Sequence, residues 1–445
     1  MSASEQLGRF IAGLQADAID PQLVLKIKDH LLDTLGVACA GLDDPQARAV
    51  AGAVQRWGGH AEATVIGAPL RLPAPKAAFV NALHARIHTF DDTHEAGPSH
   101  PGSAVVAAAL AASESAQASG RTLIAALLAG YETATRVSAA LGATHYAAGF
   151  HSTGTAAPFG AAAAAARAWR LDASRTTASL NLAGGAAVGL RQYQDDGSML
   201  DTALNGARGA EAGVTAATFA GAGADGPRGM LDGRLGVLKI MAGGSPDALV
   251  AGLGHRFEFA QTHIKPFASC RFTHGPIAAL QAARLDPRSV ATVEIVTFRQ
   301  SVDVSDRPQP RDRKEAILSH QLAAALALLG RPVVPHEFEA PDAAVRALAD
   351  RVQVRHDAAL DALYPAKWPH RIVVVLENGE RVLLESSAPP AADRDQVRAK
   401  FRTLATPVVG AASAAAIMAA VDDLERLADL SPLLRALRRD WAAAA

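Results

Sequence analysis

The sequence contains only two cysteines, Cys39 and Cys270, among its 445 residues. Two thiolates cannot supply the three or four cysteine ligands of an iron–sulfur cluster or of a cysteine-based structural zinc site. The chain also lacks an excess of charge of either sign, since 43 Lys and Arg residues stand against 44 Asp and Glu residues. This balance predicts neither a nucleic-acid-binding surface nor an acidic tail. The cysteine count means that any dehydration chemistry must proceed without an iron–sulfur cluster.

A secretory leader and a membrane span are not expected either. The first 14 residues, MSASEQLGRFIAGL, lack a basic region followed by an apolar core and a small-residue cleavage site. The uncharged stretch 137–166 is interrupted by Gly, Ser, Thr, Pro and two histidines. These interruptions predict two buried helices joined by a loop rather than a helix within a membrane. We therefore expect a cytoplasmic protein, and we find no internal repeat of roughly 20 to 50 residues.

The first 265 residues place Ala and Leu at helical spacing, with Gly and Pro between the periodic segments. This pattern predicts an all-helical region. Small alanine faces let helix axes approach closely, so we expect several of these helices to be buried on nearly all sides. The segments predicted to be helical are 23–40, 74–90, 103–118, 123–141, 154–167 and 205–219.

The composition changes after about residue 270. The segment 290–298, VATVEIVTF, alternates and is rich in β-branched residues, which predicts a strand. The segment 371–386 is predicted to form two strands joined at Asn378-Gly379, because Asn-Gly is the preferred two-residue hairpin turn. Further helices are expected at 313–329 and 341–351, and helical spacing returns at 394–439.

These patterns predict a mainly α fold with an α+β part. A length of 445 residues favours two or three domains. We expect a large all-helical domain at 1–270 and a smaller α+β lid domain at 271–399. The C-terminal residues 400–445 would pack back on the helical domain, which makes the lid domain an insertion before the C-terminal helices.

The richest polar patch spans residues 81–106. If 74–90 is helical, Asn81, His84 and His88 fall on one stripe of that helix. The stripe ends at four polar residues, Asp91, Asp92, Thr93 and His94. His100 follows in a Gly-Pro turn, where a rigid scaffold aims side chains instead of packing them into a core.

Two interpretations of the first two histidines stay open at this point. The favoured one is that His84 and His88 are helix-face side chains with ordinary hydrogen bonds. The alternative is a metal site, because His84, His88 and Asp92 recur at four-residue steps and imidazole with carboxylate suits zinc, iron or manganese. This spacing matches no established set of metal ligands.

Two further patches carry reactive side chains. In the segment 149–160, GFHSTGTAAPFG, His151 precedes three hydroxyl residues at the expected start of a helix. These hydroxyl groups and the backbone amides of the first helical turn could bind an anion. The segment 264–276 places Lys265, Arg271 and His274, with Ser269 and Cys270, at the expected domain boundary. Lys with Arg is the pair that a carboxylate-rich substrate needs, and clefts between domains are favoured ligand sites.

In this order, the three patches resemble the MmgE/PrpD family, which includes 2-methylcitrate dehydratases, cis-aconitate decarboxylases and iminodisuccinate epimerases. Four other segments share the resemblance: DTLGVACAG (33–41), GYETATRV (130–137), DDGSM (195–199) and KEAILSHQ (314–321). The resemblance implies a helical domain with a smaller α+β lid domain, a homodimer, and a site without cofactor or metal in the cleft between the domains. It also implies a small polycarboxylate substrate.

The family's site residues carry over onto matching positions of this chain. The resemblance implies active-site histidines at His100 and His151, an aspartate-threonine loop at Asp91, Asp92 and Thr93, and a cleft lysine at Lys265. The chain departs from the family pattern at four positions, namely Thr89 for Asp, Asp201 for Lys, Cys270 for His and Leu322 for Tyr. Losing a cation and a possible acid implies a substrate whose charges are placed differently from those of cis-aconitate or 2-methylcitrate.

We therefore expect a lyase of the hydro-lyase or decarboxylase type that works by acid/base chemistry beside a carboxylate. His100 and His151 would be the acid/base pair, since imidazole can serve both roles near neutral pH. Asp91 or Asp92 would orient a histidine. Substrate binding would fall to four residues, Thr93, Lys265, Arg271 and His274. The alternatives are an epimerase of an amino- or imino-dicarboxylate with two bases, a metal-dependent hydrolase, and a non-catalytic family member.

Overall fold

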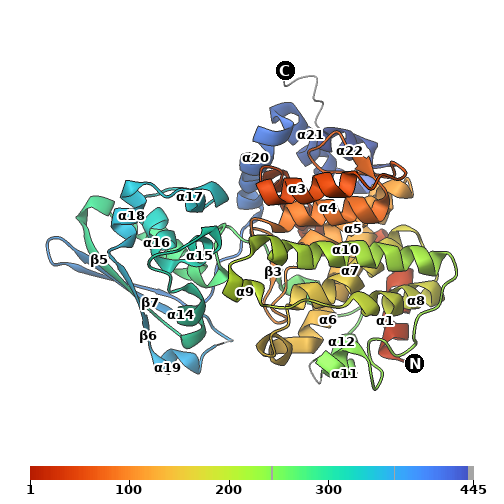
Figure 1. Cartoon of the computed structure of the whole chain (residues 1–445), viewed down its shortest axis with the longest axis horizontal. Coiled ribbons are helices and arrows are strands. Elements are labelled where there is room, and N and C mark those ends of the chain that lie inside the picture. Colours follow the sequence, from red (N-terminus) through yellow and green to blue (C-terminus); the bar gives the residue numbers. More distant parts are fainter. Residues whose placement is uncertain (242–243, 365, 439–445) are drawn as a thin grey trace. The chain divides into compact units, whose positions relative to one another are not determined.

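The computed structural model describes residues 1–241, 244–364 and 366–438. The chain forms two compact units (Figure 1). One comprises Met1–Ile264 together with the segment that begins at Asp393, and the other comprises Lys265–Ala392. The first is mainly helical, and the second combines helices with a four-stranded sheet. The predicted class, mainly α with an α+β part, is confirmed.

The helical unit has long helices with defined ends. Asp20 caps α2 through its side chain and Pro21 occupies the first turn, a combination that favours helix initiation. The helices of this unit are α1 (Ala3–Gly13), α2 (Pro21–Gly41), α3 (Pro45–Gln55), α4 (Ala74–Arg86), α5 (Gly102–Ser115), α6 (Gly120–Ala147), α7 (Ser152–Ala168), α8 (Ala173–Ala183), α9 (Tyr193–Asp196), α10 (Met199–Gly221), α11 (Val237–Met241), α12 (Pro246–Val250), α20 (Arg394–Val409), α21 (Ala411–Asp422) and α22 (Ser431–Leu437).

Helix α7 is the centre of this unit. Each of its residues is buried, which confirms that an alanine-rich helix can be covered on all sides. Helices α6 and α7 cross where Gly130 meets Gly160, and a Cβ on either glycine would press on the other helix. A similar close approach joins α2 to α4, because a Cβ on Gly41 would overlap the carbonyl oxygen of His84. These contacts explain why small residues are needed at the helix crossings.

One predicted helix end is wrong, and the difference matters for the site. The predicted helix 74–90 ends at Arg86, with Ile87 as its C-cap. Thr89 has a φ of 55°, a left-handed conformation that β-branched residues rarely adopt and that a helix cannot include. The polar residues that follow therefore lie in a loop that connects α4 to α5. Similarly, the predicted helix 313–329 is two helices, since Ser319 has an extended backbone and its hydroxyl caps the second one.

The C-terminal segment packs on the first helices of the helical unit. The Lys400 ammonium lies 2.7 Å from the Asp33 carboxylate, and Lys28 donates a 2.8 Å hydrogen bond to the carbonyl of Asp422. Arg398 makes two 2.9 Å hydrogen bonds to the Asp422 carboxylate. Helices α20 to α22 thus complete a core that α2 alone would leave open. The last residue of the predicted helical segment 394–439 lies outside the described residues.

The α+β unit is built on a sheet with strand order β6-β5-β7-β8. The predicted strand and hairpin are confirmed as β5 (Val290–Thr297), β7 (His370–Leu376) and β8 (Arg381–Ser386), with Gly379 at a positive φ in the turn. Strand β6 (Val352–His356) was not predicted. It pairs parallel to β5 at the sheet edge. The helices of this unit are α13 (His274–Ala283), α14 (Arg299–Ser305), α15 (Arg313–Leu318), α16 (His320–Leu328), α17 (Pro335–Glu339), α18 (Ala343–Ala349) and α19 (Ala358–Asp361).

Two short pairs of strands complete the helical unit. Strand β1 (Ala63–Thr64) pairs with β2 (Arg71–Leu72), and β3 (Thr93–His94) pairs antiparallel with β4 (Thr262–His263). The second pair ties the loop after α4 to the last residues before the α+β unit. No helix among the described residues is both long and apolar enough to cross a membrane.

Candidate active site

The loop 87–101, between α4 and α5, holds most of the predicted site residues of the helical unit. Its tip is closed by two backbone hydrogen bonds between His94 and Ser99, of 2.8 and 3.1 Å. Thr93 is buried in β3, where it lies opposite His263. Backbone hydrogen bonds alone therefore hold the loop at its tip and along one edge.

Asp92 is the most highly coordinated carboxylate of this loop. Its side chain accepts hydrogen bonds from His30 Nδ1 at 2.7 Å, from the Tyr131 hydroxyl at 2.9 Å and from the Gly102 backbone N–H at 2.8 Å. Burial opposes ionisation, but these donors outweigh it and hold the pKa of Asp92 below its usual value. Burial also lowers the pKa of His30. We therefore assign an ionised Asp92 that accepts Nδ1–H from a neutral His30.

Asp91 points to a different partner. Its Oδ1 accepts a 2.7 Å hydrogen bond from Arg86 Nη1, and both side chains are buried. The same oxygen lies 3.8 Å from His100 Nδ1. The Asp91 carboxylate thus contacts the Arg86 guanidinium and lies close to the His100 ring.

His100 is fixed by two contacts from its own backbone and ring. Its ring Nδ1 donates a 2.8 Å hydrogen bond to the Asp92 carbonyl oxygen, and its backbone N–H donates to Thr153 Oγ1 at 3.0 Å. In the neutral ring the proton then lies on Nδ1 and the lone pair on Nε2, a tautomer inferred from the hydrogen-bond partners. The second contact brings the loop of His100 against the first turn of α7, directly after His151.

His151 is buried at the N-cap of α7. Its backbone N–H donates a 2.8 Å hydrogen bond to the Gly189 carbonyl, and Arg191 N–H donates a 2.9 Å hydrogen bond to the Gly149 carbonyl. The His151 ring packs edge-on against Tyr193, with ring centroids 5.0 Å apart. The segment that connects α8 to α10 therefore holds the His151 loop through its backbone.

Several residues of this network were missed in the sequence, namely His30, Arg86 and Lys400. Lys400 donates a 2.7 Å hydrogen bond to the Phe90 carbonyl and lies 3.7 Å from the centroid of the Phe90 ring. Burial raises the pKa of its partner Asp33 to about 6, although Lys400 opposes this shift. His30 and Lys400 come from helices far apart in the chain, and no spacing links them to the polar loop, whereas Arg86 lies at the end of α4, five residues before Asp91. Tyr131 lies within the segment GYETATRV, which marked its position without indicating a hydrogen bond to Asp92.

The histidines at 84 and 88 do not form a metal site. His88 Nε2 donates a 3.0 Å hydrogen bond to the Ala40 carbonyl, and Asp92 is engaged by His30 and Tyr131. No group of three His, Cys, Asp or Glu side chains in the described parts of the chain is arranged to hold a metal ion. The metal interpretation of His84, His88 and Asp92 is therefore wrong, because His88 lies beyond the end of α4 and Asp92 faces α2 and α6.

The α+β unit holds the other predicted residues in and around the start of α13. Lys265 and Arg271 are both buried. Arg271 Nη1 donates to the Pro390 carbonyl at 2.5 Å and lies 3.3 Å from His274 Nδ1. His274 Nε2 lies 3.2 Å from the Ser269 carbonyl, so Nε2 carries the proton of the neutral ring and Nδ1 accepts from Arg271. Arg271 thus fixes both the tautomer of His274 and the position of the segment 389–390.

The positions that depart from the family pattern lie in different surroundings. Leu322 is buried in α16, and Cys270 is partly buried beside the aromatic cluster formed by Phe272 and Phe298. Asp201 lies in the first turn of α10 and 3.7 Å from Arg208. An acid in the first turn of a helix interacts favourably with the helix dipole, so Asp201 is well placed for stability.

Comparison with known proteins gives a consistent result over nearly the whole chain. The MmgE/PrpD N-terminal domain model matches residues 5–249, and the MmgE/PrpD C-terminal domain model matches residues 267–426. A cis-aconitate decarboxylase-like protein, oryM, of Aspergillus oryzae is 27% identical, over 97% of this chain and 96% of its own. The cis-aconitate decarboxylases of Mus musculus and Homo sapiens are 27% and 26% identical. They match 98% of this chain and 93% and 95% of their own.

We expect His84 to make the helical unit sensitive to acid. Its ring is buried and neither nitrogen has a hydrogen-bond partner, and burial lowers its pKa to about 4. Between pH 6.5 and 4 the unfolded chain binds a proton at this residue and the folded chain does not, so stability falls as the pH falls. The loss between pH 7.5 and 5 should be about 2 kcal/mol.

The measurement is the difference in free energy of unfolding between pH 7.5 and pH 5 for the wild type and for His84→Leu. The variant should lose less stability over this interval. His60→Leu, which replaces an exposed histidine, should match the wild type. Equal losses in the wild type and His84→Leu would contradict the assignment of a buried neutral imidazole.

Proposed function

The chain belongs to the MmgE/PrpD family, and on that premise we propose that it is a cofactor-free lyase acting on a small di- or tricarboxylate. The chain is an enzyme of the dehydratase or decarboxylase type, as its family and its relatives indicate. The substrate and the roles of the residues are the proposal. The observation that carries it is the buried network in which Asp91 and Asp92 hold His100 against the first turn of α7.

His100 is the first acid/base group of the proposed mechanism. Its Nδ1–H is committed to the Asp92 carbonyl, so proton transfer takes place at Nε2. When Nε2 takes up a proton, the ring becomes positively charged, and the Asp91 carboxylate at 3.8 Å from Nδ1 stabilises that charge. Arg86 keeps Asp91 ionised for this purpose. Asp91 and Asp92 are positioning residues in this scheme, since they act through the imidazole.

His151 is the second acid/base group. It lies at the N-cap of α7, and the Thr153 hydroxyl in the next turn accepts the His100 backbone N–H. The two histidine loops are thus joined by a hydrogen bond. A lyase needs one group that removes a proton and another that protonates the leaving group or the carbon, and two imidazoles can divide these roles near neutral pH.

The proposed reaction breaks one bond beside a carboxylate. In a hydro-lyase, the base removes the α-proton, the carbon–oxygen bond breaks, and the acid protonates the departing hydroxide to water. In a decarboxylase, the carbon–carbon bond breaks with loss of carbon dioxide, and the acid delivers its proton to carbon. Both routes place negative charge on an enolate-like intermediate, so cations near the substrate carboxylates lower the barrier.

Lys265 and Arg271 supply these cations in the proposal. Both are buried in the α+β unit, where a cation interacts more strongly with a carboxylate than it does in water. Thr93 and His274 are proposed to form hydrogen bonds with the substrate. Replacement of the family lysine by Asp201 removes one cation, which favours a substrate with fewer or differently placed negative charges than cis-aconitate.

The reaction class is tested by incubating the enzyme in deuterated water with citrate, aconitate, methylcitrate, malate-like and amino-dicarboxylate compounds. Thermal-shift screening first selects the acids that stabilise the folded chain, since such ligands raise the melting temperature. We expect one acid to change mass by loss of water or of carbon dioxide, as measured by NMR and mass spectrometry. Exchange of the α-proton for deuterium without any loss of water or carbon dioxide would identify an epimerase instead.

Removal of either imidazole should slow the reaction. We expect His100→Gln and His151→Gln to lower turnover on the selected acid by about 100-fold or more, because each transfers a proton in the slow step. His60→Gln is the matched control and should keep full turnover, since this histidine is exposed. Full turnover in His151→Gln would refute the second acid/base role, and full turnover in His100→Gln would refute the first.

Loss of the Lys265 charge should mainly weaken substrate binding. Lys265→Met keeps most of the length of the side chain and removes the cation, so the half-saturating substrate concentration should rise by about 10-fold or more. Lys367→Met, at an exposed lysine of the same unit, is the control and should leave this concentration unchanged. An unchanged half-saturating concentration in Lys265→Met would remove this lysine from the proposed binding site.

A further inference from the structure

The imidazole ring of His151 is held less firmly by the backbone than its main chain is. The His151 N–H donates to the Gly189 carbonyl at 2.8 Å, and the Thr155 N–H donates to the His151 carbonyl at 3.2 Å. These bonds fix the main chain, but they leave the ring free to turn about its two side-chain torsions. A group that transfers a proton has to keep its nitrogen aimed at the reacting atom, so side-chain contacts must restrict this rotation.

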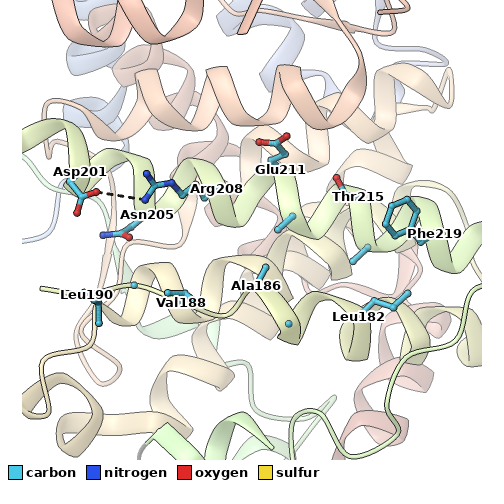
Figure 2. A pocket seen from close by; sticks show the side chains of 14 residues that line it. Leu182, Ala186, Val188, Leu190, Asp201, Asn205, Arg208, Glu211, Thr215 and Phe219 are labelled. Carbon is cyan, nitrogen blue, oxygen red and sulfur yellow. Dashed lines mark ion pairs between the residues drawn. The ribbon is translucent and has the colours of Figure 1, made fainter. Parts of the chain in front are cut away.

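The segment between α8 and α10 lies directly against the His151 loop. A Cβ on Gly189 would lie 2.9 Å from the His151 carbonyl oxygen, so only glycine permits this approach of the two backbones. The neighbouring side chains turn away, because Val188 and Leu190 are more than half exposed and line a surface pocket along α10 (Figure 2). The next buried side chain of the segment is Tyr193.

Tyr193 supplies an aromatic ring that packs on the His151 ring. The two rings meet nearly edge-on, with centroids 5.0 Å apart and an interplanar angle of 67°. Tyr193 is 7% exposed and His151 is 2% exposed, so water has little access to the contact. Aromatic pairs favour this geometry, in which the positive edge of one ring meets the negative face of the other. The contact therefore favours one orientation of the imidazole over the others.

The ring that Tyr193 presents to His151 is uncharged. Burial raises the pKa of the Tyr193 hydroxyl above its usual value, although Arg86 and Arg191 oppose the shift. The hydroxyl therefore stays protonated near neutral pH. A phenolate would change the pKa of a neighbouring imidazole through its charge, whereas the neutral side chain acts on His151 through the contact of the rings.

The residues that flank Tyr193 are tied to the end of α6. The Arg191 guanidinium lies 3.6 Å from the centroid of the Tyr146 ring and donates a 2.7 Å hydrogen bond to the Tyr146 carbonyl. Arg191 Nε also donates to the Gln194 side-chain oxygen at 3.0 Å, and Gln194 Nε2 donates to the Tyr146 hydroxyl at 3.1 Å. This Arg191–Gln194–Tyr146 clamp fixes the segment on both sides of Tyr193 and limits its own movement.

We propose that Tyr193 is a positioning residue for the reaction, whose aromatic ring holds the His151 imidazole in the orientation that proton transfer requires. Arg191 and Gln194 in turn hold Tyr193 through the clamp. The inference rests on the proposed function, because that function assigns proton transfer to His151. The alternative use of a buried tyrosine is proton donation by its hydroxyl, and the two uses predict different effects of substitution.

Two substitutions of Tyr193 separate the ring from the hydroxyl. Tyr193→Phe keeps the ring and should keep turnover on the selected acid within about 2-fold of the wild type. Tyr193→Leu removes the ring and should lower turnover by about 10-fold or more, with the half-saturating concentration unchanged, because it misaligns a proton-transfer group. Equal losses in the two variants would assign the effect to the hydroxyl and overturn the inference. Full turnover in Tyr193→Leu would also overturn it.

A double substitution shows whether Tyr193 acts through His151. In His151→Gln, the added Tyr193→Leu change should lower the residual turnover by no more than about 2-fold, because the group that it positions is already absent. A further loss as large as that in the single Tyr193→Leu variant would show independent action and overturn the inference. Full turnover in His151→Gln alone is a different outcome, since it refutes the proposed acid/base role itself.

NMR of isotope-labelled histidine measures the ring contact without substrate. The Cε1–H signal of His151, assigned by its loss in His151→Gln, should shift in Tyr193→Leu and stay nearly in place in Tyr193→Phe, which keeps the aromatic ring. Tyr364→Leu is the control, because it removes a ring from the aromatic cluster of the α+β unit and should leave this signal unchanged. An unchanged signal in a folded Tyr193→Leu variant would overturn the ring contact, whether or not the lyase reaction is refuted.

The clamp is tested in the same measurement with a variant that leaves Tyr193 itself intact. Arg191→Met removes the guanidinium from the Tyr146 ring, and the His151 signal should shift in the same direction as in Tyr193→Leu but by a smaller amount. Circular dichroism should show that both variants are folded, and the Arg191→Met result remains decisive if Tyr193→Leu does not fold. An unshifted His151 signal in Arg191→Met would overturn the role of the clamp.

Discussion

The structure of the helical unit around the candidate site depends on one buried carboxylate. The Asp92 carboxylate accepts hydrogen bonds from His30 of α2, from Tyr131 of α6 and from the Gly102 amide at the start of α5. A carboxylate without such donors would be very costly to bury, and with them it becomes a fixed point that three helices share. The orientation of His100 follows directly, since its ring donates to the backbone carbonyl of the same residue. The core and the candidate chemistry thus have a common support.

A second buried ion pair secures the other end of the same loop. Lys400, on α20, joins Asp33 of α2 to the carbonyl of Phe90, which precedes the two aspartates. The C-terminal helices are therefore more than a cover for the core, because one of them fixes the start of the polar segment. Thr89, which has a left-handed backbone, directly precedes Phe90, and the contacts around it compensate the conformational strain of that backbone.

The sequence predicted what depends on local pattern and missed what depends on distant contacts. Periodicity located the long helices, and the Asn-Gly turn located the β7–β8 hairpin. Strand β6 was missed because it has only five residues, of which only Val352 and Val354 are apolar, and it lies at the sheet edge. The polar loop was predicted to carry site residues, but its contacts with His30 and Lys400 were not, since tertiary packing brings these two residues to it. The end of α4 was misplaced because the helical spacing of apolar residues continues to residue 90, whereas the left-handed backbone of Thr89 cannot be part of a helix.

The charge balance of the helical unit bears on the proposed substrate. Arg86 is paired with Asp91, and Lys400 is paired with Asp33, so each of these two buried cations neutralises a carboxylate of the protein itself. Neither can be drawn to a substrate carboxylate without leaving a buried acid unpaired, which would cost more than a surface ion pair returns. In the proposed mechanism, the negative charge of a carboxylate substrate is therefore balanced by cations outside this network, which the proposal assigns to Lys265 and Arg271.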